Sequence, residues 1–173
     1  MREKADRERI EDFMMALGRA ANAEGRVYFT GGACAVLLGW RRTTIDIDVK
    51  LDPPRDRLFQ AISEIKEELR VNVDLANPGD FIPELPDCES RRIFISQQRR
   101  LTFYHYDFYS QALAKLERGH TQDLEDVRHM IERGIIDRPV AFEYFKKIEP
   151  WIYRYPAIAT SVFRKSVEKA LKD

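Results

Sequence analysis

The sequence predicts an α+β fold, in which a mixed sheet of about five strands is flanked by helices and followed by a C-terminal helical region. Short β-branched and aromatic runs alternate with amphipathic helical patterns up to about residue 110. Only helical patterns follow, and no Gly/Ser-rich linker separates the two parts. We therefore expect a sheet-bearing body at residues 1–110, with a helical region at residues 111–173 packed on it.

Composition and charge narrow the class of protein. A chain of 173 residues with 44% hydrophobic content can bury one good core. Its 29 basic and 29 acidic side chains cancel, so any contact with nucleic acid must come from a local patch. Cys34 and Cys88 lie far apart and outside any CxxC spacing, which argues against a disulfide framework or a zinc site. No stretch reaches the ~18 apolar residues of a membrane span, so we expect a cytoplasmic protein.

A glycine pair interrupts the first strand-to-helix connection. Apolar side chains recur at three- and four-residue steps over residues 9–22, which predicts an amphipathic helix. Residues 27–30 are β-branched or aromatic and lead directly into Gly31-Gly32, after which residues 33–38 are typical of a short buried helix. The expected order is strand, tight glycine turn, helix.

Residues 44–50 alternate strictly between apolar and polar side chains, as in a half-buried strand. Its polar face carries Asp46 and Asp48. A helical pattern over residues 55–69 leads to a new strand at residues 71–75. This stretch therefore predicts a strand, a crossover helix and a second strand.

Turn residues set the remaining boundaries. Residues 77–80 and 83–89 predict a loop over the sheet edge, and residues 92–95 and 101–108 predict a hairpin around the polar residues 97–100. Helix signals then define four helices at residues 111–118, 122–133, 139–148 and 159–171. Phe103, Tyr104, Tyr106 and Phe108 fall on the expected last strand, whose side chains alternate between faces, so for some of them core packing is favoured over a base-stacking platform.

The acid pair and the glycine pair together predict a phosphate site. Asp46 and Asp48 leave one strand face a few ångströms apart, where a divalent cation would turn their repulsion into coordination. Magnesium, or manganese, suits carboxylate oxygens that are completed by water and substrate phosphates. Gly31 and Gly32 would let backbone amides approach phosphate oxygens at the start of the next helix. One triphosphate would then be held from two sides.

Gly31-Gly32, thirteen residues and Asp46-Ile47-Asp48 resemble the glycine-pair-to-DxD signature of the DNA polymerase β-like nucleotidyltransferase superfamily. The resemblance implies a nucleotidyltransferase fold and the transfer of NMP from an NTP to a hydroxyl. It also implies that the two aspartates hold two metal ions and that an acid on a following strand completes the site.

By position that third acid is Asp74. Asn77, Asp80 and Asp107 also lie near expected sheet ends, and Asp107 ranks second. Both Asp74 and Asp107 therefore remain open.

Two further groups of residues are candidate nucleotide ligands. Arg41, Arg42 and Thr43 precede the acid strand, where they could touch the β- or γ-phosphate. Lys115, Arg118, Asp123 and Asp126 resemble the Lys…Arg…Asp-x-x-Asp motif of AbiEii-type nucleotidyltransferase toxins. Lys115 and Arg118 share a helix face that could meet phosphate charge, with Asp123 orienting them. A solvated helix pair with weak ion pairing is the alternative.

The resemblances also imply partners. The acceptor would be an RNA 3′ end, a protein or a small molecule, and a toxin would have an antitoxin partner. The chain as a whole is similar to an uncharacterised group of compact nucleotidyltransferase-like proteins. The alternative function is a catalytically degenerate module that binds a nucleotide or a partner.

Overall fold

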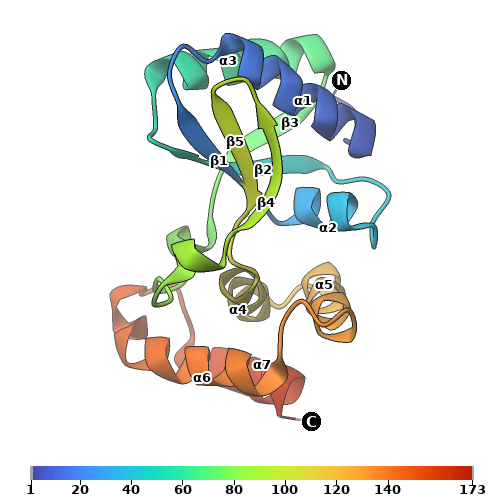
Figure 1. Ribbon diagram of the computed structural model, residues 1–173. Coiled ribbons are helices and arrows are strands. Elements are labelled where there is room, and N and C mark those ends of the chain that lie inside the picture. The colour runs from blue at the N-terminus through green and yellow to red at the C-terminus, as the bar shows by residue number, and fades with distance from the viewer. Residues whose placement is uncertain (1, 173) are drawn as a thin grey trace. The chain divides into compact units, whose positions relative to one another are not determined.

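The computed structural model describes residues 2–172 and divides the chain into two compact units (Figure 1). The first unit runs to Asn77 and includes Ile93–His105. The second comprises Pro78–Arg92 and the chain from Tyr106 onward. The predicted division after residue 110 differs from this, because the chain leaves the sheet at residue 78, returns for a hairpin and leaves again at residue 106.

The first unit is built on a five-stranded mixed sheet with strand order β3-β2-β1-β5-β4. The β1/β2 and β4/β5 pairs are antiparallel, and the β1/β5 and β2/β3 pairs are parallel. This confirms the predicted α+β class. Its elements are α1 (Arg7–Ala20), β1 (Gly25–Thr30), α2 (Gly32–Leu38), β2 (Asp46–Asp52), α3 (Asp56–Leu69), β3 (Asn72–Leu75), β4 (Ile93–Gln98) and β5 (Leu101–His105).

One face of this sheet forms the core of the first unit. Ile47 and Val49 of β2 are fully buried, as the alternation of the sequence predicts. The Phe29 ring of β1 stacks on Phe103 of β5, with centroids 5.8 Å apart, and lies 6.1 Å from the ring of Phe13 on α1. The acidic side chains of β2 therefore point to the opposite face.

The second unit contains helices and short 3-10 turns. Phe145 and Phe163 meet edge to face in its core, with centroids 5.1 Å apart. Among residues 2–172, no helix combines the length and the apolar character that a membrane crossing requires. The elements are η1 (Pro78–Asp80), η2 (Cys88–Arg91), α4 (Phe108–Arg118), α5 (Thr121–Glu132), α6 (Arg138–Ile148), η3 (Glu149–Arg154) and α7 (Thr160–Leu171).

The predicted hairpin is correct in kind and wrong in its boundaries. Gln97 and Gln98 continue β4, because they pair with Thr102 and Leu101, so the turn is only Arg99-Arg100. The second strand ends at His105 and not at residue 108. The helix that follows begins at Phe108, so Tyr106 and Phe108 are core residues of the second unit rather than strand residues.

His105 makes the stability of the first unit depend on pH. The residue is only 4% exposed on β5, and burial lowers the pKa of its imidazole from 6.5 to about 4. The unfolded chain therefore binds a proton below about pH 6.5, while the folded chain resists it until about pH 4. Stability is full above pH 6.5 and falls as the pH drops through this window, by roughly 2 kcal/mol at pH 5.

Urea unfolding at pH 7 and pH 5 checks this expectation. His105→Asn removes the titrating group, so the loss of stability between the two pH values should shrink. His120→Asn, at an exposed position, is the matched control and should leave the loss unchanged. Equal losses in wild type and His105→Asn would show that other groups cause the acid sensitivity.

Candidate active site

Three carboxylates lie on the sheet face opposite the core. Asp46 and Asp48 are half-buried on β2, and Asp74 is exposed on β3. Asp48 pairs in register with Asp74 across the parallel β2/β3 ladder, so both side chains leave the same face on strands about 5 Å apart. The register therefore brings the predicted third acid beside the predicted pair.

The glycine pair lies against this acid group. Gly31 has a φ of 64°, and a Cβ there would lie 2.9 Å from Asp48 Oδ2. A Cβ on Gly32 would lie 2.1 Å from Thr44 Oγ1 and 2.9 Å from Arg41 Nη1. Side chains are thus excluded at both positions, and the backbone of the turn directly faces the Asp48 carboxylate.

A series of side-chain hydrogen bonds holds the Asp46 carboxylate in place. Asn72, its register partner on β3, donates Nδ2 to Asp46 Oδ1. Arg2 in turn donates Nη1 to Asn72 Oδ1 at 2.9 Å and Nη2 to Glu67 Oε1 at 2.6 Å. Because its oxygen is held by Arg2, the Asn72 amide must present its nitrogen to Asp46. Asn72 is therefore a positioning residue for the acid pair.

The predicted phosphate ligands before β2 are not placed alike. Arg41 reaches the Gly32 backbone, and it also lines a shallow hollow together with Arg42 and the start of α1. Arg42 and Thr43 are exposed. Only Arg41 is thus placed against the glycine turn, and all three roles remain predictions.

Asp107 lies in the second unit, and its carboxylate is hydrogen-bonded there. Its carboxylate accepts hydrogen bonds from the backbone nitrogens of Tyr109 and Ser110 and from Ser110 Oγ, which makes it the N-cap of α4. Arg91 donates two further hydrogen bonds to Asp107, from Nε at 2.9 Å and from Nη2 at 2.7 Å. Five donors thus hold a side chain that is fully buried. Asp74, which the register places beside Asp48, is the stronger candidate for the third acid.

The basic motif of the helical region forms a network of ion pairs in which Arg118 is exposed and the other three members are buried. Lys115 Nζ lies 2.8 Å from Asp126 Oδ2 and 3.6 Å from Asp123 Oδ1. Arg118 donates Nε and Nη2 to Asp123 at 2.8 and 2.5 Å. Lys115, Asp123 and Asp126 are all buried, so the alternative of a solvated helix pair is wrong. The nucleotide-binding roles of Lys115, Arg118 and Asp123 remain predictions.

This network lowers the pKa of Asp123. Burial raises the pKa of Asp123, but the hydrogen bonds from Arg118 and the charge of Lys115 lower it by more. The pKa of Asp123 therefore lies below its ordinary value, and the carboxylate stays ionised beside two cations.

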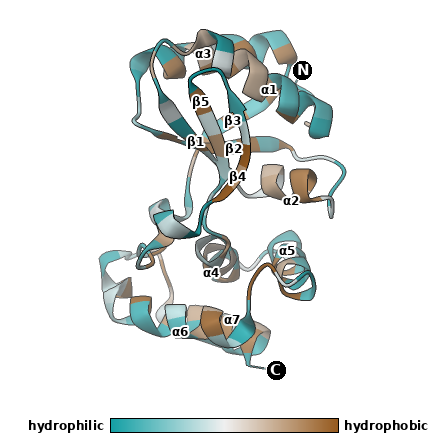
Figure 2. Ribbon diagram, viewed as in Figure 1, coloured by the Kyte–Doolittle hydropathy of each residue, from teal (hydrophilic) through white to brown (hydrophobic). Residues whose placement is uncertain are grey.

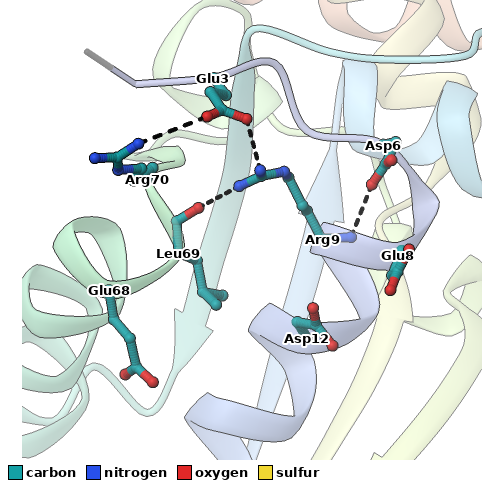
Figure 3. A pocket seen from close by; sticks show the side chains of 8 residues that line it. All are labelled: Glu3, Asp6, Glu8, Arg9, Asp12, Glu68, Leu69 and Arg70. Carbon is teal, nitrogen blue, oxygen red and sulfur yellow. Dashed lines mark hydrogen bonds and ion pairs between the residues drawn. The ribbon is translucent and has the colours of Figure 1, made fainter.

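A charged hollow at the N-terminal segment has a structural role (Figure 3). Arg9 donates to the Leu69 carbonyl at 2.5 Å and to Glu3 Oε2 at 2.6 Å, and Asp6 caps the backbone nitrogen of Arg9. These contacts fix the segment in which Ala5 forms an isolated bridge with Thr44. The hollow therefore helps to hold the loop that enters β2.

Sequence reasoning missed Asn72, Thr44 and Arg2. Asn72 stands two residues before Asp74, so the period of a strand could have placed it on the acid face. Thr44 packs on Gly32 and donates to the Asp46 carbonyl at 2.9 Å, which its place before the strand does not reveal. No local pattern marks Arg2, because its contact with Asn72 joins residues seventy positions apart.

One of three comparisons with known proteins finds a match. A family model described as "Nucleotidyltransferase of unknown function (DUF6036)" matches residues 8–150. No curated protein and no solved structure matches the chain. The matched range contains the glycine pair and all three acids, and it does not single out the AbiEii branch. The chain therefore belongs to this family of nucleotidyltransferases of unknown function.

Proposed function

We propose that the protein is a metal-dependent enzyme that transfers NMP from an NTP to a hydroxyl acceptor. The observation that carries the proposal is the approach of the Gly31 backbone to the Asp48 carboxylate, so close that a Cβ would lie 2.9 Å from Oδ2. A phosphate chain bound there would meet backbone amides on one side and acids on the other. Such an arrangement needs a cation between carboxylate and phosphate, since both are anionic.

The donor set fits magnesium or manganese. Asp46, Asp48 and Asp74 offer hard carboxylate oxygens on two adjacent strands. Within residues 2–172, no three His, Cys, Asp or Glu side chains form a ready-made metal cluster. Water and NTP phosphates would complete the coordination, as is usual for magnesium at phosphate-transfer sites. Two ions held by these acids would neutralise the triphosphate and lower the pKa of the acceptor hydroxyl.

The residues of the chain have separate tasks in this reaction. The acceptor oxygen forms a bond to the α-phosphorus, and the bond from that phosphorus to the β-phosphate oxygen breaks. Pyrophosphate leaves with the electron pair, and the hydroxyl proton passes to Asp74. Asn72 keeps Asp46 oriented, and Arg41 adds positive charge at the glycine turn where the pyrophosphate would lie.

The narrower form of the proposal is a toxin of a toxin-antitoxin pair. Its support is the likeness of Lys115, Arg118, Asp123 and Asp126 to the AbiEii-type motif. In this form an RNA 3′ end, a protein or a small molecule accepts NMP, and an antitoxin partner restrains the activity.

A second candidate function is a nucleotide-binding or partner-binding module without transfer. It is favoured by the hydrogen bond that already occupies Asp46 Oδ1 and by the lack of a ready-made metal cluster among residues 2–172. Calorimetry distinguishes the two, because the enzyme should bind NTP in a magnesium-dependent way. Binding that ignores magnesium would favour the module.

The proposed function is tested with labelled NTPs, magnesium and either total tRNA or cell lysate. We expect a labelled acceptor, and we expect the label to disappear with a chelator or with Asp46→Ala. The proposal fails if no acceptor is labelled and Asp46→Ala leaves NTP binding unchanged.

A further inference from the structure

Three aromatic rings form a row across the sheet face that carries the acids. Phe94 on β4 pairs in register with Tyr104 on β5, and Tyr104 pairs with Tyr28 on β1. Tyr104 stacks on Tyr28 with centroids 5.6 Å apart, and Phe94 meets Tyr104 edge-on at 6.3 Å. We call Phe94, Tyr104 and Tyr28 the aromatic row.

The aromatic row is anchored at one end and exposed at the other. Tyr28 is 2% exposed, Tyr104 is half-buried and Phe94 is 61% exposed. Figure 2 colours the start of β4 as hydrophobic, and β4 is an edge strand of the sheet. The buried Tyr28 ring packs against Tyr104, and Tyr104 contacts Phe94 edge-on, so the exposed Phe94 ring is held in a fixed orientation.

The aromatic row leads to the candidate active site. Tyr28 pairs in register with Lys50 of β2, and Lys50 stands two residues from Asp48 on the same face. Neighbouring strands lie about 4.8 Å apart, which puts Tyr104 roughly 10 Å across the sheet from β2. A short single strand can span that distance between a terminal ribose at the acids and the bases behind it.

We propose that the acceptor hydroxyl belongs to the 3′ end of a single-stranded nucleic acid whose bases stack on Phe94 and Tyr104. This inference rests on the proposed function and names its acceptor. Every base has a π face, so stacking would tolerate any sequence. Lys50, which lies beside Tyr28 and two residues from Asp48 on the same face, supplies local positive charge for a phosphate backbone in a chain whose charges otherwise cancel.

Fluorescence anisotropy with labelled hexaribonucleotides and hexadeoxyribonucleotides tests the proposal without metal or NTP. Phe94→Ala should weaken binding at least about fivefold, and Phe94→Trp should retain it. The matched control is Ile93→Ala, because Ile93 is also exposed but points to the opposite face of β4, and it should change binding little. The two oligonucleotides distinguish an RNA acceptor from a DNA acceptor.

Two results would overturn the inference. One is a wild type that binds neither oligonucleotide at about 100 µM, the weak limit of non-specific binding. The other is an equal effect of Phe94→Ala and Ile93→Ala. Binding that depends on Phe94 in a protein without transfer activity would support the aromatic row and reject the proposed function. If the protein transfers NMP to a different acceptor and binds no oligonucleotide, the proposed function is supported and the nucleic-acid acceptor is rejected.

Discussion

Asp48→Asn is expected to lower nucleotidyl transfer by at least about a hundredfold, because a metal ion contributes several kcal/mol to transition-state stabilisation and each 1.36 kcal/mol is tenfold in rate. Asn keeps the size of the side chain but loses the charge that would bind a cation. The carboxylate also faces Gly31, where the phosphates are proposed to lie. The measurement is the transfer of labelled NMP at saturating NTP and magnesium.

The matched control is Asp52→Asn on the same strand and the same face. Asp52 is paired with Arg26 at 2.8 Å and lies four residues beyond Asp48, away from the glycine turn. It should leave the rate nearly unchanged, and both variants should unfold at similar urea concentrations. Equal losses of activity in the two variants would mean that the acid face acts through general charge and not through a metal site.

Sequence periodicity was sufficient to predict the centre of this site. The strict alternation of β2 put Asp46 and Asp48 on one face, and the pattern of buried and half-buried residues confirms it. The glycine pair was predicted from its place between a strand and a helix, and Gly31 has the positive φ that favours glycine. These features are local, since each depends on residues only a few positions apart.

The contacts that support the site depend on distant residues. Asp74 could be ranked above Asp107 only by chain order, whereas the β2/β3 register places it directly beside Asp48. Asp107 stood at the end of an aromatic run that alternates like a strand. Its competing signal, a helix N-cap before residues 108–110, decided the real boundary. The predicted strand was therefore extended to residue 108, past the N-cap at Asp107 where the helix begins.

Burial of charge was the least predictable property. Lys115 and Asp126 could be expected at the surface because they are charged, and they stand on two different helices, eleven positions apart, so no pattern within one helix pairs them. Yet Lys115 is flanked by Leu113 and Leu116, which are both buried. Only the packing of α4 against α5 shows that the lysine side chain points inward, where its charge must be paired.

Lys115→Met is expected to lower the free energy of unfolding by about 3–5 kcal/mol, as when one partner of a buried ion pair is removed. Asp126 is fully buried and would lose its cation at 2.8 Å, while Asp123 would keep its ion pair with Arg118. The measurement is urea unfolding at pH 7. The control is Arg128→Met on α5, the helix that carries Asp126. It breaks the exposed Arg128–Glu132 pair and should lower the free energy of unfolding by no more than about 1 kcal/mol.

The double variant Lys115→Met/Asp126→Leu distinguishes a structural role from a nucleotide-binding one. It removes the uncompensated carboxylate and restores an apolar contact, so it should recover most of the stability that Lys115→Met loses. NTP affinity of this folded double variant then tests Lys115 as a phosphate ligand without interference from unfolding. Unchanged affinity would confine the lysine to holding α4 against α5, whereas a stable protein that no longer binds NTP would make Lys115 a nucleotide ligand. A single variant as stable as wild type would contradict the premise that these charges need one another.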